Sequence, residues 1–107
     1  ITESDTIISE NNLFEWDSQK NSDNIKKHGF GFDEITDVFL DPYLITLYDE
    51  KHSSEEDRFY SVGSLHGLLI IVVYHTERDG RTRIISARQA EKKLQEVYYD
   101  FIKKING

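Results

Sequence analysis

Four side chains that serve in acid–base chemistry and anion binding occur within the single stretch 68–88. They are His75, Glu77, Arg83 and Arg88. An imidazole and a carboxylate can move protons, and a guanidinium can stabilise negative charge that develops during a reaction. This combination predicts proton-transfer chemistry beside a phosphate group. The alternative is an ordinary half-solvated sheet face with polar cross-strand pairs.

The same stretch is predicted to form a β-hairpin that positions these groups. Residues 68–74 and 83–87 favour strands, and Asp79-Gly80 supplies the tight turn because glycine tolerates a positive φ. The expected cross-strand pairs are His75–Ile84, Glu77–Thr82, Val73–Ser86 and Ile71–Arg88. Because side chains alternate between faces, one face is expected to be polar and reactive. That face carries His75, Glu77, Ser86 and Arg88.

Composition indicates one domain of 107 residues. The chain has no cysteine, and its longest apolar run is too short to span a bilayer, so we expect a cytoplasmic protein without membrane contact. Residues 1–57 hold 15 acidic and 4 basic side chains, whereas residues 58–107 hold 5 acidic and 9 basic side chains. The net charge of −7 argues against a general nucleic-acid binder. The arginines clustered in 78–88 form either a small phosphate-binding patch or a soluble charged turn.

The elements expected along the chain define an α+β class. Residues 1–12 are expected to be a tail or an extra edge segment, followed by a short strand at 13–16. A helix at 18–28, capped by Asp17 or Ser18 and ended by Gly29, precedes a second short helix that starts at Asp33 and ends before Pro42. Strands are expected at 43–48, 58–63, 68–74 and 83–87, and an amphipathic helix at 89–104. Short turns predict an antiparallel meander with two N-terminal helices and one C-terminal helix.

Short sequence pieces in a fixed order carry a family resemblance. They include Phe14-Glu15-Trp16-Asp17, Lys27-His28-Gly29, Phe39-Leu40-Asp41-Pro42, Asp49 and His52 followed by Glu56 and Arg58, His75-Thr76-Glu77-Arg78, and Arg83-Ile84-Ile85-Ser86-Ala87-Arg88. Together, from residue 14 to about residue 98, the chain resembles the BrnT toxins, small bacterial ribonucleases of type II toxin–antitoxin pairs. By this resemblance, residues 1–12 are an N-terminal extension and residues 13–107 a single BrnT-like toxin domain.

The resemblance implies a RelE-like fold and RNA cleavage without a metal or cofactor. It also implies neutralisation by a cognate BrnA-like antitoxin that represses its own operon, so operator DNA is contacted only through the antitoxin. A toxin dimer within that complex is a further expectation. The chain departs from the family pattern at Leu94, Gln95 and Glu96, which predicts a less basic last helix.

Metal-free RNA cleavage requires a base for the 2′-hydroxyl, a cation for the phosphorus centre and an acid for the 5′ leaving oxygen. His75 or Glu77 is the expected base, and Arg83 or Arg88 the expected cation. His28 or Lys20, from the first helix, would complete the site if that helix folds over the hairpin. The expected RNA contacts are Lys20, Lys27, His28, Arg78, Arg81 and Lys92.

Each of these assignments has a structural alternative. His28 can cap its helix, the lysines can be solvated, Arg83 can pair with a carboxylate and Arg88 with Glu91. The acidic run 49–57, which contains His52, is typical of a solvated turn. No spacing indicates a metal site. A non-catalytic module, whose sheet edge or hairpin docks a partner, is the alternative function.

Overall fold

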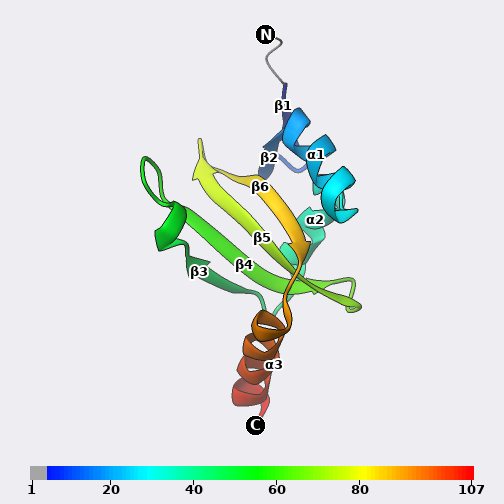
Figure 1. The fold of residues 1–107 in the computed structure, drawn as a ribbon, viewed down its shortest axis with the longest axis vertical. Helices are drawn as coiled ribbons and strands as arrows, with labels where there is room; N and C mark the ends of the chain where they lie inside the picture. Colours follow the sequence, from blue (N-terminus) through cyan, green and yellow to red (C-terminus); the bar gives the residue numbers. More distant parts are fainter. Residues whose placement is uncertain (1–4) are drawn as a thin grey trace.

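The computed structural model describes residues 5–107 (Figure 1). The elements in chain order are β1 (Thr6–Ile8), β2 (Phe14–Asp17), α1 (Ser18–His28), α2 (Phe32–Ile35), the 3₁₀ helix η1 (Thr36–Leu40), β3 (Ile45–Tyr48), the 3₁₀ turn η2 (Glu50–His52), β4 (Arg58–Leu65), β5 (Leu69–Arg78), β6 (Arg81–Gln89) and α3 (Lys92–Asn106). The α+β class predicted from the sequence is therefore confirmed. No helix among these residues is long and apolar enough to cross a membrane.

The sheet has six strands in the order β1-β2-β6-β5-β4-β3. β3 to β6 form the predicted antiparallel meander, but β2 pairs with β6 in parallel, so the expectation of a purely antiparallel sheet was wrong. β1 pairs with β2 and makes the edge, which is one of the two forms expected for residues 1–12. Residues 1–4 of that segment lie outside the described part of the chain.

Local sequence signals set the ends of several elements. The Asp17 side chain accepts a hydrogen bond from the backbone N–H of Lys20 at 3.0 Å and caps α1, as predicted. Gly29 ends α1 with a φ of 82°. Asp79 and Gly80, with φ values of 54° and 78°, form the tight turn between β5 and β6. These three signals are read correctly from the sequence because each acts over only a few residues.

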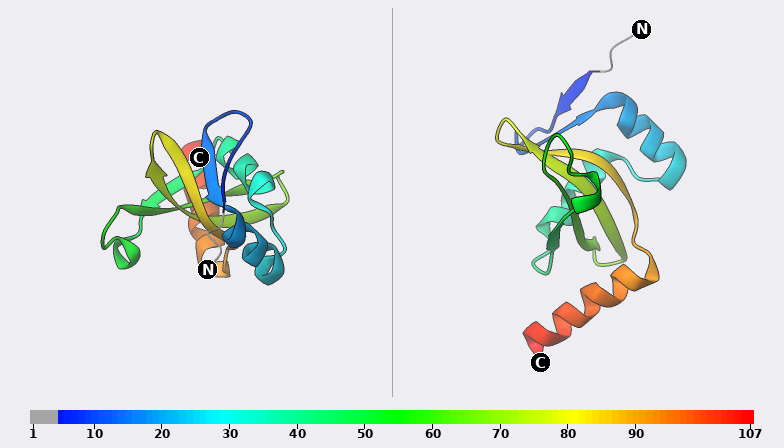
Figure 2. Two further views of the ribbon diagram at one scale, coloured as in Figure 1. Left: turned by 90° about the horizontal axis from the view of Figure 1, so that it is seen from above. Right: turned by 60° about the vertical axis from the view of Figure 1, so that its left-hand side comes forward.

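The first face of the sheet is covered by α2 and η1, and α1 lies against β6 (Figures 1 and 2). The core on this face is built from Phe14, Trp16, Phe32, Ile35, Val38, Leu65, Ile71, Val73, Ile84 and Ala87. Gly63 lets η1 approach β4 closely, since a Cβ atom at that position would lie 3.0 Å from Val38 Cγ1 and 3.2 Å from the Val38 carbonyl oxygen. Burial of these side chains is the main source of stability for the domain.

The second face of the sheet is covered only at one end, by α3. Tyr98 of α3 packs with Val62, Ile70, Val72 and Ala90 in a smaller core cluster. α3 projects away from the sheet at the end opposite β1 (Figure 2), and within residues 5–107 no other helix contributes to the core cluster on this face. The fold therefore has a covered face that forms the core and a partly open face that can receive a ligand.

Candidate active site

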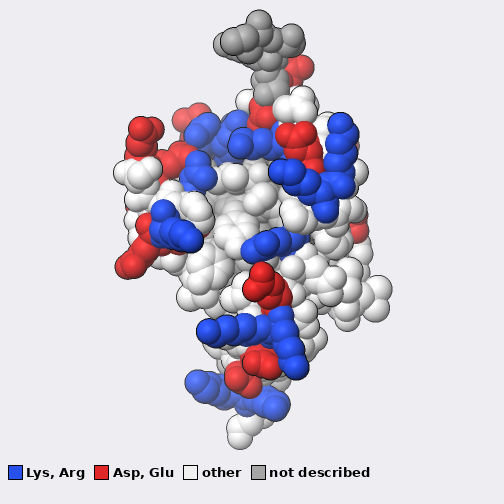
Figure 3. Space-filling model, viewed as in Figure 1, with Lys and Arg blue, Asp and Glu red and all other residues white. Residues whose placement is uncertain are grey.

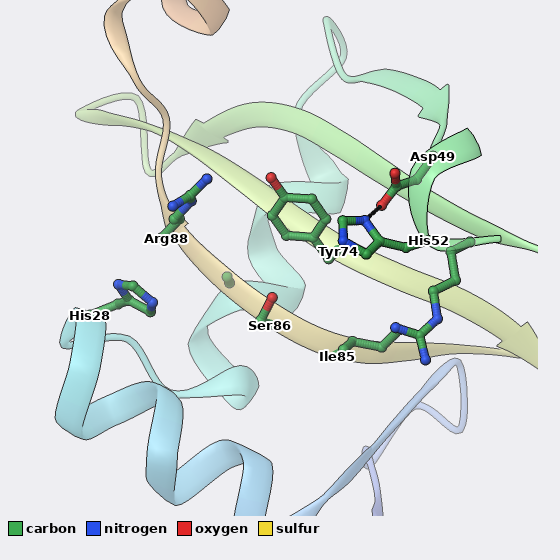
Figure 4. A pocket seen from close by; sticks show the side chains of 9 residues that line it. His28, Asp49, His52, Tyr74, Ile85, Ser86 and Arg88 are labelled. Atoms are coloured by element: carbon green, nitrogen blue, oxygen red, sulfur yellow. Dashed lines mark hydrogen bonds and ion pairs between the residues drawn. The ribbon is translucent and has the colours of Figure 1, made fainter. Parts of the chain in front are cut away.

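A pocket of about 310 Å³ lies on the open face, between the end of α1, the η2 turn and strands β4 to β6 (Figure 4). Its lining residues are His28, Asp49, His52, Arg58, Tyr74, Ile85, Ser86, Ala87 and Arg88. Two imidazoles, two guanidinium groups, a carboxylate and two hydroxyl groups thus line one concave surface. The pocket therefore combines proton-transfer groups with cations, which is the chemistry expected from the sequence, on a different set of residues.

A β-bulge between β5 and β6 explains the difference. His75 pairs with Ile84 and Glu77 with Thr82, as predicted, but Tyr74 pairs with Ser86. Ile85 is the extra residue, and beyond it the predicted pairs Val73–Ser86 and Ile71–Arg88 are wrong by one position. A shift of one residue exchanges the two faces of a strand.

The bulge separates the four side chains that were expected to share a face. Val73 pairs with Ala87, and Val72 pairs with Arg88. Ser86 and Arg88 therefore lie on the open face with Tyr74, whereas His75 lies on the covered face. The prediction of a single reactive face was wrong because it carried strict alternation through the bulge.

His75 is part of the covered core and is only 5% exposed. Its Nε2 atom is 2.7 Å from Ser61 Oγ, and its ring packs against Phe39 and Phe59. Its Nδ1 atom is the one buried side-chain nitrogen or oxygen in residues 5–107 without a hydrogen-bond partner. Burial lowers the pKa of His75 to about 4, so the ring is neutral near pH 7. His75 does not line the pocket.

Arg83, predicted to be a catalytic cation, forms an ion pair with Glu15 of β2. Glu15 is only 4% exposed, and its other oxygen lies 3.7 Å from a guanidinium nitrogen of Arg81. Arg81 also donates to the side-chain oxygen of Asn12, at 2.8 Å and 3.1 Å. Loss of Arg83 would leave a buried carboxylate undercompensated, so its structural role is to join β2 to β6.

Two other predicted residues lie near the hairpin tip. Glu77 is exposed and accepts a hydrogen bond from Thr82 Oγ1 at 3.0 Å. Arg78 is paired with Glu56 at 3.1 Å. Neither residue lines the pocket around Tyr74.

Arg88 does line the pocket and is exposed. Within residues 5–107 it makes no hydrogen bond or ion pair, so the expected alternative of pairing with Glu91 is not present there. It projects from β6 shortly before the start of α3 (Figure 4). An unpaired guanidinium on a rigid strand is available to hold two oxygens of a phosphate group.

Asp49 and His52 are joined by a hydrogen bond between their side chains within the pocket. His52 Nδ1 lies 2.8 Å from Asp49 Oδ2 (Figure 4). Asp49 is 8% exposed, and its backbone N–H donates to the carbonyl of Arg58 at 2.8 Å. Because a carboxylate accepts, the contact favours the tautomer that carries its proton on Nδ1 and leaves Nε2 free to accept a proton.

The composition of the segment with Asp49 and His52 predicts a solvated acidic turn. Their spacing of three residues, one helical turn apart, was the signal that could have identified the pair. Arg58, which follows that segment and begins β4, also lines the pocket. A guanidinium nitrogen of Arg58 lies 3.6 Å from a carboxylate oxygen of Glu56, at the rim of the pocket.

The end of α1 extends the pocket with basic side chains. A neighbouring hollow shares His28, Ile85 and Ser86 with the pocket and adds two lysines, one carboxylate and one amide: Lys20, Lys27, Asp23 and Asn24. Lys92, the first residue of α3, lines neither hollow. Lys and Arg side chains surround a pale hollow on this view of the molecule (Figure 3). The local charge therefore favours an anionic ligand although the whole chain is acidic.

Comparison with known proteins gives a consistent result. A family model described as the ribonuclease toxin BrnT of type II toxin–antitoxin systems matches residues 16–93. The crystal structure of the Brucella abortus ribonuclease toxin BrnT is similar to this chain, with 29% sequence identity and a TM-score of 0.55. The similarity covers 72% of this chain and 94% of that chain. No curated protein sequence matches.

The buried position of His75 predicts a pH-dependent loss of stability. Between its ordinary pKa of 6.5 and about 4, the unfolded chain binds a proton at His75 that the folded chain excludes. The stability linked to His75 is therefore complete above pH 6.5 and falls as the pH drops toward 4, by on the order of 3 kcal/mol. Urea unfolding of the wild type and of His75→Gln at several pH values measures the difference.

The control is His66→Gln, because His66 is exposed and, unlike His75, faces a carboxylate, Asp37, at 2.9 Å. Between pH 6.5 and 4 the His75 variant should lose less stability than the wild type, whereas the His66 variant should not. Equal slopes for all three proteins would contradict the buried, neutral state of His75.

Proposed function

The chain belongs to the BrnT family of ribonuclease toxins of type II toxin–antitoxin systems, and we propose that it cleaves RNA without a metal ion in the pocket around Tyr74. Membership of the family implies neutralisation by an antitoxin. A BrnA-like antitoxin, operator contact through that antitoxin and a toxin dimer within the complex are parts of the same proposal. The proposal also includes a RelE-like fold.

One observation carries the proposal: the Asp49–His52 pair and the unpaired Arg88 line the same pocket. A base whose tautomer is favoured by a carboxylate and a free guanidinium are two of the groups that metal-free cleavage requires. The site residues proposed here differ from those predicted, because His75, Glu77 and Arg83 are engaged elsewhere. Of the predicted catalytic set, Arg88 stays in the site.

The proposed reaction begins with proton transfer from the RNA 2′-hydroxyl to His52 Nε2. The 2′ oxygen then attacks the adjacent phosphorus, and the bond from phosphorus to the 5′ oxygen breaks. His28 lies on the other side of Ser86 from His52 and would donate the proton that the 5′ oxygen takes up (Figure 4). The products are a 2′,3′-cyclic phosphate and a 5′-hydroxyl.

Arg88 and Arg58 would stabilise the charge that grows on the phosphate oxygens. This stabilisation is most effective where the cation is already in position and partly shielded from water. Lys20 and Lys27, beside His28, would hold the RNA backbone on the α1 side of the pocket. The other predicted RNA contacts, Arg78, Arg81 and Lys92, would lie at the periphery.

Replacement of Arg88 tests the function. We expect Arg88→Ala to lower kcat/KM for RNA cleavage in buffer with a metal chelator by roughly 10²- to 10³-fold, by analogy with the loss of an oxyanion donor. The melting temperature should stay close to that of the wild type, because Arg88 makes no ion pair or hydrogen bond within residues 5–107. Arg88→Lys keeps the positive charge but cannot form a bidentate contact with a phosphate group, so it should recover only part of the activity.

The matched control is Lys93→Ala, which removes a cation from the exposed start of α3. It should cleave at nearly the wild-type rate. An Arg88→Ala protein that cuts RNA as fast as the wild type would rule out this site. Wild-type activity that disappears with chelator and returns with Mg²⁺ would rule out the metal-free reaction.

The role of Asp49 makes a second prediction. Asp49→Asn removes the carboxylate that selects the tautomer of His52, so we expect kcat to fall by about 10²- to 10⁴-fold with little change in KM. Glu50→Gln, the adjacent and exposed position, is the control and should leave both constants near the wild type. A rise in KM with kcat unchanged would instead assign Asp49 to substrate binding.

A further inference from the structure

Two tyrosines stand side by side on the open face of the sheet. Tyr60 of β4 pairs directly with Tyr74 of β5, and their ring centroids are 6.1 Å apart with an interplanar angle of 38°. The same row continues to Leu47 of β3 and Ser86 of β6. Both tyrosines are half-buried. We name Tyr60 and Tyr74 the tyrosine pair.

The tyrosine pair packs against the core on one side and faces solvent on the other. Its rings pack against the small core that includes Val62 and Val72. Neither phenol hydroxyl has a hydrogen-bond partner within residues 5–107. α3 packs on this face through Tyr98 and Leu94, near Val62 and Ile70, and from there it projects away from the sheet (Figure 1). Tyr74 and Arg58 line the pocket. A rigid aromatic surface with unused hydroxyls is therefore presented to solvent.

Arginines flank the tyrosine pair on both sides. Arg58 precedes Tyr60 by two residues on β4, so it lies on the same face at roughly 7 Å along the strand. Arg88 follows Ser86 on β6, on the other side of Tyr74, and both arginines line the pocket. Figure 4 shows the Tyr74 ring between Arg88 and His52. The aromatic surface thus adjoins both the cations and the proposed base.

We propose that the tyrosine pair stacks two unpaired bases next to the cleaved phosphate, so that the substrate is single-stranded RNA. Aromatic rings bind bases of any sequence through their flat faces, while nearby arginines hold the backbone. In a duplex the bases are stacked on one another and cannot reach the rings. This inference rests on the proposed function, since it concerns the substrate of the same site.

The test compares binding and cleavage of a short RNA as a single strand and annealed to its complement. We expect the wild type, in chelator, to cleave the single strand at least about 100-fold faster. Tyr74→Leu should weaken binding of the same RNA, made uncleavable by 2′-deoxy nucleotides, by roughly 5- to 150-fold, the range reported for loss of one stacked base. Tyr74→Phe keeps the ring and should recover most of that loss. Tyr99→Leu, an exposed tyrosine on α3, is the matched control.

An abasic nucleotide separates stacking from a purely structural role. Removing the base that stacks on Tyr74 should weaken binding to the wild type but not further weaken binding to Tyr74→Leu. Equal cleavage of duplex and single strand would overturn the proposal, as would additive losses in this cycle. So would a Tyr74→Leu protein that binds RNA normally but no longer binds the antitoxin. Absence of any cleavage by the wild type would instead contradict the proposed function, while the binding measurements still decide on stacking.

Discussion

The position of α1, and with it one side of the pocket, depends on a single buried amide. Asn24 is 4% exposed, and it pairs with both backbone groups of Ala87: its Nδ2 donates to the carbonyl at 2.9 Å, and its Oδ1 accepts from the N–H at 3.0 Å. It also donates to the carbonyl of Phe30 at 3.0 Å. β2 pairs with β6 only as far as Ile84, so Asn24 satisfies backbone groups beyond the end of the parallel ladder. Each such group left unpaired in the interior costs about 1–3 kcal/mol.

The bulge at Ile85 lies between these two attachments of β6. On one side of it, Ile84 faces the core beside Trp16, and on the other, Ala87 faces the core at the Asn24 contact. Ser86 is thereby turned to the open face, as is Arg88. Bulges often re-aim side chains at functional sites. Here the bulge keeps the apolar face continuous while it delivers a hydroxyl and a guanidinium to the pocket.

The sequence predicts features that depend on near neighbours. The Asp79-Gly80 turn, the Asp17 cap, the Gly29 helix end and the amphipathic C-terminal helix were all expected and are present, although α3 runs from Lys92 to Asn106 rather than from residue 89 to 104. The parallel β2–β6 pair was missed because its strands are distant in sequence and carry no turn signal. The bulge was missed because the adjacent isoleucines at 84 and 85 suit either register.

The sequence predicted the types of side chain at the candidate site, but only some of the residues that supply them. Arg88 and His28 line the pocket as two of the residues singled out from the sequence, whereas the buried state of His75 depends on packing by Phe39 and Phe59 that no local pattern reveals. Asp49 and His52 stand among the residues that carry the family resemblance, but the composition of the acidic run around them is typical of a solvated turn, so neither was predicted to be catalytic. β1 and almost all of α3 lie outside the residues that match the family model, 16–93, whereas every residue that lines the pocket lies within them.

The proposed function requires RNA to bind the open face of the sheet, on the side to which the bulge turns Ser86 and Arg88. NMR spectra of the isotopically labelled protein, titrated with an uncleavable 2′-deoxy-substituted RNA, locate the bound RNA. We expect the resonances of His52, Tyr74, Ser86 and Arg88 to shift together, while those of Glu77 and Thr82 on the other face change little. Shifts confined to Glu77, Thr82 and the hairpin tip, with the pocket resonances unchanged, would contradict binding at the open face.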